Sequence, residues 1–572
     1  SGNYRQTVGT LLGDLSLRQN LEVLTPGLAA EIAVAFDNVG SMYDQATKTY
    51  RYKDAQASIS TDKTLISHPA IYGKDSEVIG HSQAFYSLYM RSDLQAKIDY
   101  DRSWNRHHLQ TAVIYDQQAY TANGRNNSIR RQSLLLTAGY TFDNRYTVNW
   151  VGNYSGSAYL PEGDAFHFYP AVNAAWILSG EPFLKKSEWI DLLKISASCG
   201  ISGWDGNLSH ELWRQSYGNT NAHGYYFSNN VSAYSGLAEG NLAAENLVPE
   251  QSFRMTFGAE LQAFQNRLSI AVEGFAERRS NILISSGALV SGIIGIGVGM
   301  QPAGEQKYRG VDASLAWDDF RGDFSYGFYA NGAWLDSEVV NDGQEYQPYD
   351  YLYHRGNRVG QCYGLEGGGI FQSQMEINES PVQTFSTVRP GDFKYRDQNG
   401  DNRIDERDVV RMYGSSIPRF YFGFGLHAGW KGLELSAEFQ GLTGYTVNLL
   451  NCPLYKPLID NGNISQTLLE HEIPWTPERA AEATMPRLTT QANANNYQNN
   501  SFWYRDGSFI KLRNLTLSYT LSKRILRIAE MKIYLQGTNL LCLDNLKLVD
   551  PEQLGASYPA VRSYWAGVKF NF

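Results

Sequence analysis

Hydrophobic and polar residues alternate with a period of two along much of this chain. At the C-terminus one face holds Tyr564, Ala566, Val568, Phe570 and Phe572, and the other holds Trp565, Gly567, Lys569 and Asn571. Successive side chains of a β-strand point to opposite sides of the sheet. Each such segment is therefore predicted to be a strand with one face suited to lipid and the other to water.

The same alternation recurs at many places in the sequence. Apolar and polar or glycine positions alternate over 93–100, 253–261, 268–274, 420–430 and 433–440, and Lys431-Gly432 forms a tight turn between the last two segments. These segments run to about 10 residues or more, whereas strands of soluble proteins average about 5–6. Aromatic residues mark strand ends at Tyr146, Trp150 and Trp334. Long strands flanked by aromatic residues are typical of transmembrane β-barrels.

Composition supports the same fold class. The 572 residues would suggest several soluble domains on length alone. However, only 19% are charged, while 13% are aromatic and 53 are glycine. No apolar stretch reaches the roughly 18 residues that a membrane-spanning helix needs. We therefore predict an all-β, transmembrane antiparallel β-barrel with long extracellular loops.

Links between the predicted strands alternate between short and long. Short turns fall at 104–107, 142–145, 264–267, 318–323 and 430–433, and long links at 42–85, 203–250, 336–419, 443–507 and 544–563. Outer-membrane barrels have short periplasmic turns and long extracellular loops. We accordingly expect extracellular loops at 337–418 and 444–507, and a periplasmic C-terminus.

We predict roughly 17 strands, a count that does not close an even-numbered bacterial barrel. Because an unpaired strand edge in lipid is prohibitively unfavourable, we expect several strands to lie outside this sequence. They would precede Ser1 or come from another piece of the same protein.

The loop at 337–418 contains an acidic motif that begins at Asp397. Counted from there, oxygen ligands fall at positions 1, 3, 5, 9 and 12, and position 7 offers a backbone carbonyl, which is close to the calcium-loop pattern. The residues are Asp397, Asn399, Asp401, Asp405 and Asp408, with the carbonyl of Arg403. Two interpretations stay open, namely a structural Ca²⁺ site and a solvated Asx-turn loop.

Candidate enzymatic chemistry is sparse. The net charge of −9 argues against nucleic acid as a partner. The four cysteines are far apart, and one bridge between Cys362 and Cys452 is allowed. Glu434 and Glu438 lie on the same face of one strand. A glycosidase would need two carboxylates on either side of a scissile bond, so solvated carboxylates of a polar wall are the better interpretation. We predict that the protein is not an enzyme.

Several motifs follow one another along the chain, namely Phe168–Trp176 with Glu181–Leu184, Leu192–Ser198, Tyr308–Leu315, Arg389–Asp405 followed by Ser416–Phe424, Phe509–Tyr519 and Gly537–Leu540. They resemble those of the SusC/RagA family of TonB-dependent outer-membrane transporters. They occur in the family's order across nearly the whole chain. The chain is thus identified as the β-barrel portion of such a transporter, over residues 1–572, without the N-terminal plug and the first strands.

The resemblance implies a plugged barrel of about 22 strands in the outer membrane. It also implies a SusD-like surface lipoprotein as a lid, and energy delivered by TonB through a segment outside this sequence. We expect an importer of glycan or peptide oligomers. The alternative is a SusC-like barrel recruited as a subunit of an outer-membrane assembly or secretion complex.

Aromatic residues in the long loops are candidates for substrate contacts, because sugars and peptides stack on aromatic rings. The candidates are Trp204, Trp213, Tyr225, Tyr226, Tyr351 and Trp503. Packing within the loops or against the lid is the alternative for each of them.

The C-terminal strand 564–572 resembles the recognition signal of the outer-membrane assembly machinery, with Phe570 and Phe572 on its apolar face. We predict that Phe572→Asp reduces assembly into the outer membrane, because a charge on the lipid face is unfavourable. Heat-modifiable electrophoretic mobility measures the folded barrel, and an unchanged amount would contradict the prediction.

Overall fold

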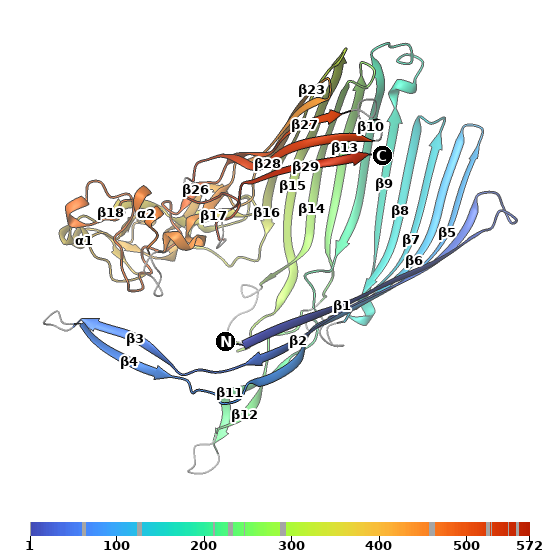
Figure 1. The fold of residues 1–572 in the computed structure, drawn as a ribbon. Coiled ribbons are helices and arrows are strands. Elements are labelled where there is room, and N and C mark those ends of the chain that lie inside the picture. The colour runs from blue at the N-terminus through green and yellow to red at the C-terminus, as the bar shows by residue number, and fades with distance from the viewer. Residues whose placement is uncertain are drawn as a thin grey trace. The chain divides into compact units, whose positions relative to one another are not determined.

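The computed structural model consists mainly of antiparallel strands (Figure 1). It describes residues 2–59, 65–122, 128–209, 212–226, 233–244, 246–285, 293, 295–456, 464–521, 527, 529–546, 548–555 and 560–571. Seventeen strands of this described part belong to one sheet, in agreement with the predicted count. No helix among these residues has both the length and the apolar character to cross a membrane. The chain divides into two compact units, which are treated separately below.

The first unit contains the N-terminal strands. Their bounds are β1 Gly2–Asn20, β2 Leu28–Thr47, β3 Tyr52–Ile59, β4 Leu65–Tyr72, β5 Gly80–Trp104, β6 His107–Ala122 and β7 Ser128–Phe142. Strands β1, β2, β5, β6 and β7 pair in that order, each antiparallel to the next. Strands β3 and β4 form a separate hairpin within the predicted long link 42–85. Strands β8 Tyr146–Ser157 and β9 Phe166–Ile177 contribute residues to both units.

The second unit contains the long strands that follow. Their bounds are β10 Ile190–Trp204, β13 Glu250–Ala263, β14 Leu268–Ser285, β15 Met300–Arg321, β16 Phe324–Asn341, β23 Phe420–Trp430, β24 Leu433–Thr443, β27 Phe509–Leu521, β28 Glu530–Asp544 and β29 Ser563–Asn571. Each pairs antiparallel with the next, and β10 also pairs with β9. The hairpin β11 Tyr217–Tyr226 and β12 Ala233–Glu239 links β10 to β13.

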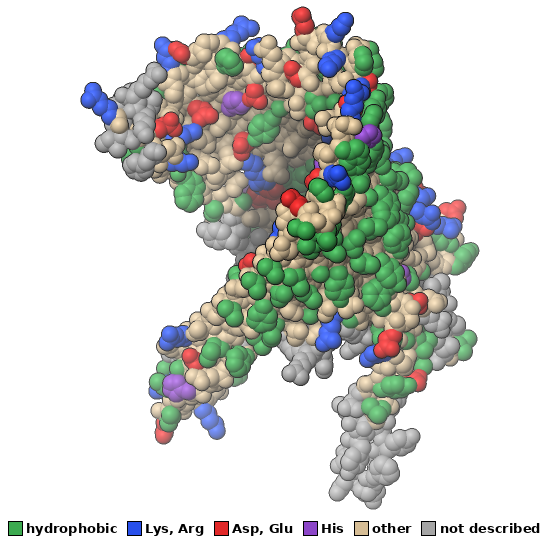
Figure 2. All heavy atoms as spheres, turned by 90° about the vertical axis from the view of Figure 1, so that its right-hand side faces the viewer, with side chains coloured by type: hydrophobic (Ala, Val, Ile, Leu, Met, Phe, Trp, Pro, Cys, Tyr) green, Lys and Arg blue, Asp and Glu red, His purple; other side chains and the backbone are tan. Residues whose placement is uncertain are grey.

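The two faces of the sheet differ in chemistry, as the alternation predicts. Figure 2, which looks onto the sheet from the right-hand side of Figure 1, shows a broad area of hydrophobic side chains with charged side chains mainly toward its margins. In the second unit, Met255, Phe257, Val311, Leu426 and Leu535 are exposed apolar residues of this kind. Such exposure in water would be an aggregation hazard, whereas in a bilayer it is the surface that lipid covers.

The long links between β16 and β29 (Ser563–Asn571) contribute to a compact loop domain, which we define as residues 342–419, 444–456, 464–508, 545–546 and 548–555. Its short elements are β17 Gln361–Leu365, β18 Gly367–Ile370, α1 Gln374–Glu379, β19 Val382–Gln383, β20 Phe393–Tyr395, β21 Arg403–Ile404, β22 Val409–Ser415, β25 Thr446–Asn448, α2 Gln466–His471 and β26 Tyr504–Asp506. Figure 1 shows α1, α2, β17, β18 and β26 gathered together. The predicted loops 337–418 and 444–507 therefore share one body.

The core of the loop domain is made by residues from both loops. Trp503 is fully buried at its centre, and the rings of Phe393, Phe502, Tyr455 and Tyr497 lie 4.8–6.2 Å from it, centre to centre. The Trp503 indole N–H donates to the backbone carbonyl of Asn496 at 2.8 Å. Burial of a large ring with its N–H satisfied is strongly stabilising. Two loops far apart in the sequence are thereby held together.

A cluster of side-chain hydrogen bonds around Glu181 joins the start of β8, the end of β9 and the link to β10. The Glu181 carboxylate accepts from the Tyr146 hydroxyl at 2.5 Å, from the Trp176 indole at 3.0 Å and from Arg145 at 2.8 Å. The hydrogen bonds from Tyr146 and Trp176 hold the pKa of Glu181 below its ordinary value of 4.5. A carboxyl with a lowered pKa contributes stability that is present above its ordinary pKa and lost as the pH falls below it.

We predict that Glu181→Gln lowers the thermal stability of the barrel near neutral pH, because the charge-assisted hydrogen bonds are lost. The difference from wild type should shrink as the pH falls below 4.5, the ordinary pKa of glutamate, and the wild-type carboxyl itself takes up a proton. Heat-modifiable mobility against temperature at neutral pH and at such a lower pH measures this. An equal difference at both would contradict the assigned role of the carboxylate charge.

Candidate functional site

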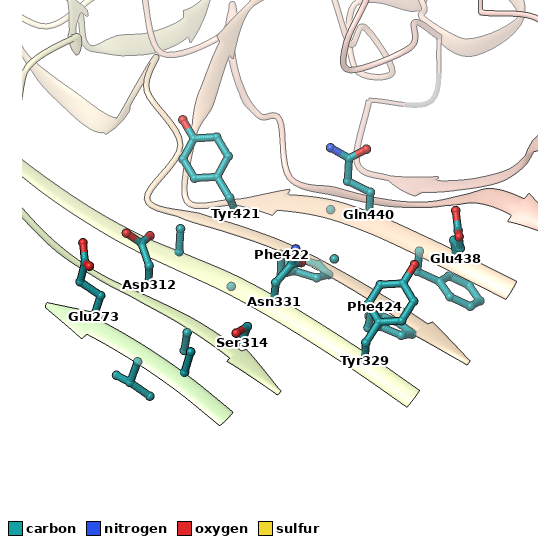
Figure 3. A pocket seen from close by; sticks show the side chains of 18 of the residues that line it. Glu273, Asp312, Ser314, Tyr329, Asn331, Tyr421, Phe422, Phe424, Glu438 and Gln440 are labelled. Carbon is teal, nitrogen blue, oxygen red and sulfur yellow. The ribbon is translucent and has the colours of Figure 1, made fainter. Parts of the chain in front are cut away.

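The polar face of the second unit carries an open pocket of about 1020 Å³. Strands β10, β13–β16, β23, β24 and β27 build it. Figure 3 shows the Glu273, Asp312, Tyr421 and Gln440 side chains projecting from one side of the sheet. The polar side chains that line the pocket are Lys194, Ser196, Glu260, Glu273, Asp312, Ser314, Tyr329, Asn331, Tyr421, Glu438, Gln440, Arg513 and Asn514.

Strand register brings these polar positions together. Ser314 lies opposite Asn331, and Glu438 lies opposite Asn514. Successive residues of a strand alternate between the two faces of the sheet, whereas residues paired across neighbouring strands face the same side. Polar residues of several strands therefore gather on one face only when the strands pair in this register. A shift of one residue would exchange the polar pocket for the apolar face. The pocket is therefore a direct product of the register.

Glycines on β23 leave room for side chains of β16. A Cβ added to Gly425 would meet the Tyr329 ring at 2.3 Å, and one added to Gly423 would meet the Asn331 amide oxygen at 2.8 Å. The large polar side chains of β16 thus lie over bare backbone of the next strand. This explains why phenylalanine alternates with glycine in Phe420–Gly425: the apolar face is filled by rings, while the polar face is left open.

Acidic groups outnumber basic groups in the pocket. Glu260, Glu273, Asp312 and Glu438 face Lys194 and Arg513. Glu260 pairs with Lys194 at 3.3 Å, and Glu438 accepts from Asn514 at 2.7 Å. Glu273 and Asp312 lie directly opposite each other on β14 and β15, and of the two Glu273 forms an ion pair with Arg254 at 3.8 Å. Like charges at opposed positions disfavour the sheet and favour a cationic or hydrogen-bond-donating ligand.

The pair Glu434 and Glu438 does not act as one unit. Glu434 forms an ion pair with Lys532 at 2.8 Å and accepts from Ser518 at 3.3 Å, whereas Glu438 bonds to Asn514. Each carboxylate is therefore satisfied by its own neighbours on β27 and β28, as expected for a polar wall.

Among the predicted aromatic residues, those whose side chains the structure describes lie in different surroundings. Trp204 ends β10 and is 55% exposed, Trp213 is half-buried beneath Arg214, and Tyr351 donates to the carbonyl of Arg407 at 2.7 Å. Tyr225 and Tyr226 belong to β11, but their side chains lie outside the described part of the chain. Trp503 is buried in the loop domain and cannot contact a substrate, so that prediction is wrong for this residue.

The predicted calcium loop is closed by its own hydrogen bonds. Asp397 accepts from the backbone N–H groups of Gly400 and Asn402 at 2.7 and 2.8 Å. The fully buried Asp408 accepts from the N–H groups of Gln398 and Asp405 at 2.8 and 2.9 Å. Asn402 occupies the left-handed region at φ 61°, which asparagine tolerates.

Nearby cations partly neutralise this loop. Arg407 lies 3.7 Å from Asp401 and 3.4 Å from Asp405. Within the described ranges, no group of three or more His, Cys, Asp or Glu side chains is arranged to hold a metal ion. These contacts are those of an Asx-turn loop, the second of the two interpretations, and the Ca²⁺ site with Asn399 and Arg403 stays a prediction.

If the loop binds Ca²⁺, a chelator should lower the melting temperature of the loop domain, and Asp397→Asn should remove that sensitivity because one charged ligand is lost. Glu482→Gln, an exposed substitution elsewhere in the same domain, serves as the matched control. Intrinsic tryptophan fluorescence, to which Trp475 and Trp503 of the loop domain contribute, follows the melting. A melting temperature that is indifferent to chelator and calcium in the wild type would rule the site out.

A buried ionic network escaped the sequence analysis. The ammonium of Lys511 on β27 lies 2.6 Å from Asp550 and 2.6 Å from Glu552, and Arg513 also pairs with Glu552. A bulge between Leu512 and Asn514 makes room for Arg513 in the strand. The segment between β28 and β29 is thus tied to the polar face. Acidic residues in a loop gave no signal of which strand they would meet.

The four cysteines are free thiols, so the allowed bridge between Cys362 and Cys452 is not formed. Both are buried in the loop domain. They therefore act as small apolar side chains there.

Comparison with known proteins defines the class. No protein-family profile matches the chain. The TonB-dependent receptor P26 of Formosa agariphila is 26% identical over 438 residues, which is 72% of this chain and 42% of the relative. The TonB-dependent receptor SusC of Bacteroides thetaiotaomicron is 21% identical over 497 residues, 81% of this chain and 45% of the relative. The chain thus spans less than half the length of these curated relatives.

The fold agrees with these matches. The structure of the RagAB peptide transporter superposes with a TM-score of 0.76 at 18% identity, covering 100% of this chain and 62% of that one. A RagAB structure in the open-open state gives 0.72 with 99% and 62% coverage. These similarities give the chain the fold of the RagAB barrel and relate its sequence to TonB-dependent receptors. Within that class the chain is SusC/RagA-like, as its motifs predicted, and its relatives are receptors and transporters rather than enzymes.

Proposed function

We propose that this chain forms the barrel wall and the extracellular loop domain of a TonB-dependent importer of the SusC/RagA type. The observation that carries the proposal is the sheet of the second unit, which has an apolar face for lipid and a polar face with an open pocket. A wall of this kind separates a bilayer from a hydrated path. The matches to TonB-dependent receptors supply the transport class.

The substrate is an oligomer rich in hydrogen-bonding groups, a glycan or a peptide. The pocket presents carboxylates, amides and the hydroxyls of Tyr329 and Tyr421 along several strands. Such a surface can exchange hydrogen bonds with successive units of a chain-like ligand. Since carboxylates are in excess, a neutral glycan or a basic peptide is favoured over a polyanion.

Transport requires further components. A plug would close the barrel, TonB would deliver energy from the inner membrane, and a SusD-like lipoprotein would cover the extracellular mouth. The loop domain is a suitable docking body for such a lid, because its buried core fixes the shape of its surface. In this arrangement the short turns face the periplasm.

The alternative is a SusC-like barrel that serves an outer-membrane assembly or secretion complex. Such a subunit would use the barrel as a scaffold, and the chemistry of the polar pocket would be immaterial to it. Substitutions in the pocket therefore distinguish the two functions.

The decisive experiment compares cells with the intact gene, a deletion, and pocket variants in the intact protein. Fluorescent neutral oligosaccharides and basic, neutral and acidic peptides serve as probes. We expect uptake of at least one class to disappear on deletion, on removal of TonB and on collapse of the proton gradient. The double variant Glu273→Gln/Asp312→Asn should lower uptake of basic peptides by about tenfold, the equivalent of about 1.4 kcal/mol.

The double variant Glu188→Gln/Asp323→Asn, at exposed short turns outside the pocket and the loop domain, removes the same number of charges and should transport normally. Unchanged uptake of every probe after deletion, together with altered secreted or surface-assembled proteins, would favour the alternative.

A further inference from the structure

The outer face of β14–β16 carries basic residues where its apolar band ends. One row across the strands is Phe257, Gly274, Val311 and Trp334. The next row toward the long loops is Met255, Ala276, Arg309 and Asp336, and the row beyond it is Phe253, Arg278, Lys307 and Glu338. Successive rows on one face lie about 6.8 Å apart along the strands. The cations therefore begin one row beyond Trp334.

These cations are open to the surroundings. The Arg309 side chain is 72% exposed and that of Arg278 is 61% exposed. A pocket of about 320 Å³ lies among them. It is lined by the apolar residues Phe253, Met255 and Ala276, by the cations Arg278, Lys307 and Arg309, and by the carboxylates of Glu277, Asp336 and Glu338. It therefore combines an apolar surface that continues the lipid-facing band with a group of nitrogen donors at the band's margin.

Local carboxylates do not balance this positive charge. A single carboxylate, Asp336, is shared by Arg309 at 2.9 Å, Arg419 at 3.4 Å and Arg358 at 3.5 Å. Burial and the charge of Arg419 lower the pKa of Arg358, as expected where guanidinium groups crowd together. Arg278 is paired with Glu305 at 2.8 Å. With Lys307 and Glu338 included, five cations share three carboxylates, and the cluster keeps a net positive charge.

The opposite margin of the same sheet is arranged differently. There Arg267 pairs with Asp319 at 3.2 Å, and Lys431 pairs with Asp323 at 3.8 Å. Because each of these two cations is paired with its own carboxylate, this margin attracts an external anion less strongly. The excess of charge is thus a feature of the margin next to the long loops.

We propose that this basic cluster, formed by Arg278, Lys307 and Arg309 with Arg419, binds a lipid whose headgroup carries phosphate in the extracellular leaflet. The phosphate accepts hydrogen bonds from the guanidinium and ammonium groups, which suit phosphate oxygens. The acyl chains lie on Phe253, Met255, Ala276 and the apolar rows beneath. One molecule thereby satisfies the charge and covers the adjoining apolar surface.

A lipid fits this place better than a soluble protein does. The cluster lies on the lipid-facing side of the strands and adjoins the apolar band directly, so the part of any ligand that reaches toward Val311 and Trp334 must be apolar. Basic residues at a membrane margin attract anionic headgroups. The inference requires the outer-membrane location and the orientation given above, but it does not depend on which substrate is transported.

The test uses the intact purified protein in nanodiscs of neutral phosphatidylcholine with a small fraction of lipid A, either diphosphorylated or dephosphorylated. Native mass spectrometry counts the lipid A that stays bound. We expect the wild type to retain the phosphorylated form preferentially. The triple variant Arg278→Gln/Lys307→Gln/Arg309→Gln should lose retention by about fivefold for each charge removed.

The matched control is Lys194→Gln/Arg254→Gln/Lys532→Gln. It also removes three positive charges, but from the polar face of the same sheet. It should retain lipid A like the wild type. Arg309→Lys, which keeps the charge, should also retain it, and Arg309→Glu should not. These single variants keep the test valid if the triple variant folds poorly.

Equal retention of both lipid A forms by the wild type would overturn the proposal, as would equal losses in the triple variant and its control. Uptake measured on the same variants separates this inference from the proposed transport function. A triple variant that transports normally yet loses lipid A supports the lipid site, whereas a wild-type protein that transports normally but retains both forms of lipid A equally refutes that site alone.

Discussion

The structure depends on one constraint, which is that every strand must satisfy its backbone hydrogen bonds through its neighbours while its side chains alternate between lipid and water. In hydrocarbon no water is available to satisfy a free N–H or C=O group. The register between strands is therefore the variable that places every side chain. A slip of one residue would put Glu273 and Asp312 against lipid and Val272 and Val311 in the polar pocket.

That constraint also accounts for the distribution of glycine and aromatic residues. On β23 the rings of Phe420, Phe422 and Phe424 occupy the apolar face, while glycines on the other face leave space for Tyr329 and Asn331. Where the apolar face ends, the chemistry changes within one row from Trp334 to Arg309 and Asp336. The wall is thus graded along its height, from apolar to aromatic to charged, and each level matches a different part of its surroundings.

The loop domain is stabilised by different interactions from the sheet. Its stability comes from burial of apolar side chains and from side-chain hydrogen bonds, as in a soluble protein. Asp392, which is fully buried, accepts from the side chains of Asn493 and Asn496, both at 2.9 Å, and pairs with Arg487 at 2.8 Å. A buried carboxylate is tolerated only with such compensation. The long loops are therefore an ordered surface rather than loose connections.

Local pattern was sufficient for much of the wall, because strand alternation is a local property. The predicted links at 443–507 and 544–563 match the observed strand ends at Thr443, Phe509, Asp544 and Ser563 closely. Motifs around Tyr308, Arg389 and Phe509 indicated the SusC/RagA resemblance that the comparisons confirm. Contacts between distant segments were beyond such reasoning. In the sequence Trp503 is an aromatic loop residue of the kind that contacts ligands. In the structure it is a core residue, because Phe393 from the other long loop packs against it.

By itself, then, the sequence determined the all-β class, the two-faced strands and the position of the long links, since these follow from residue order within a strand. Only the tertiary structure decided that the long loops form one packed domain, that Lys511 meets Asp550 and Glu552, and that Arg309, Arg358 and Arg419 share one carboxylate. The reason is physical: alternation encodes which way a side chain points, but not which distant side chain it meets. That is set by the register of each strand pair and by how the loops pack.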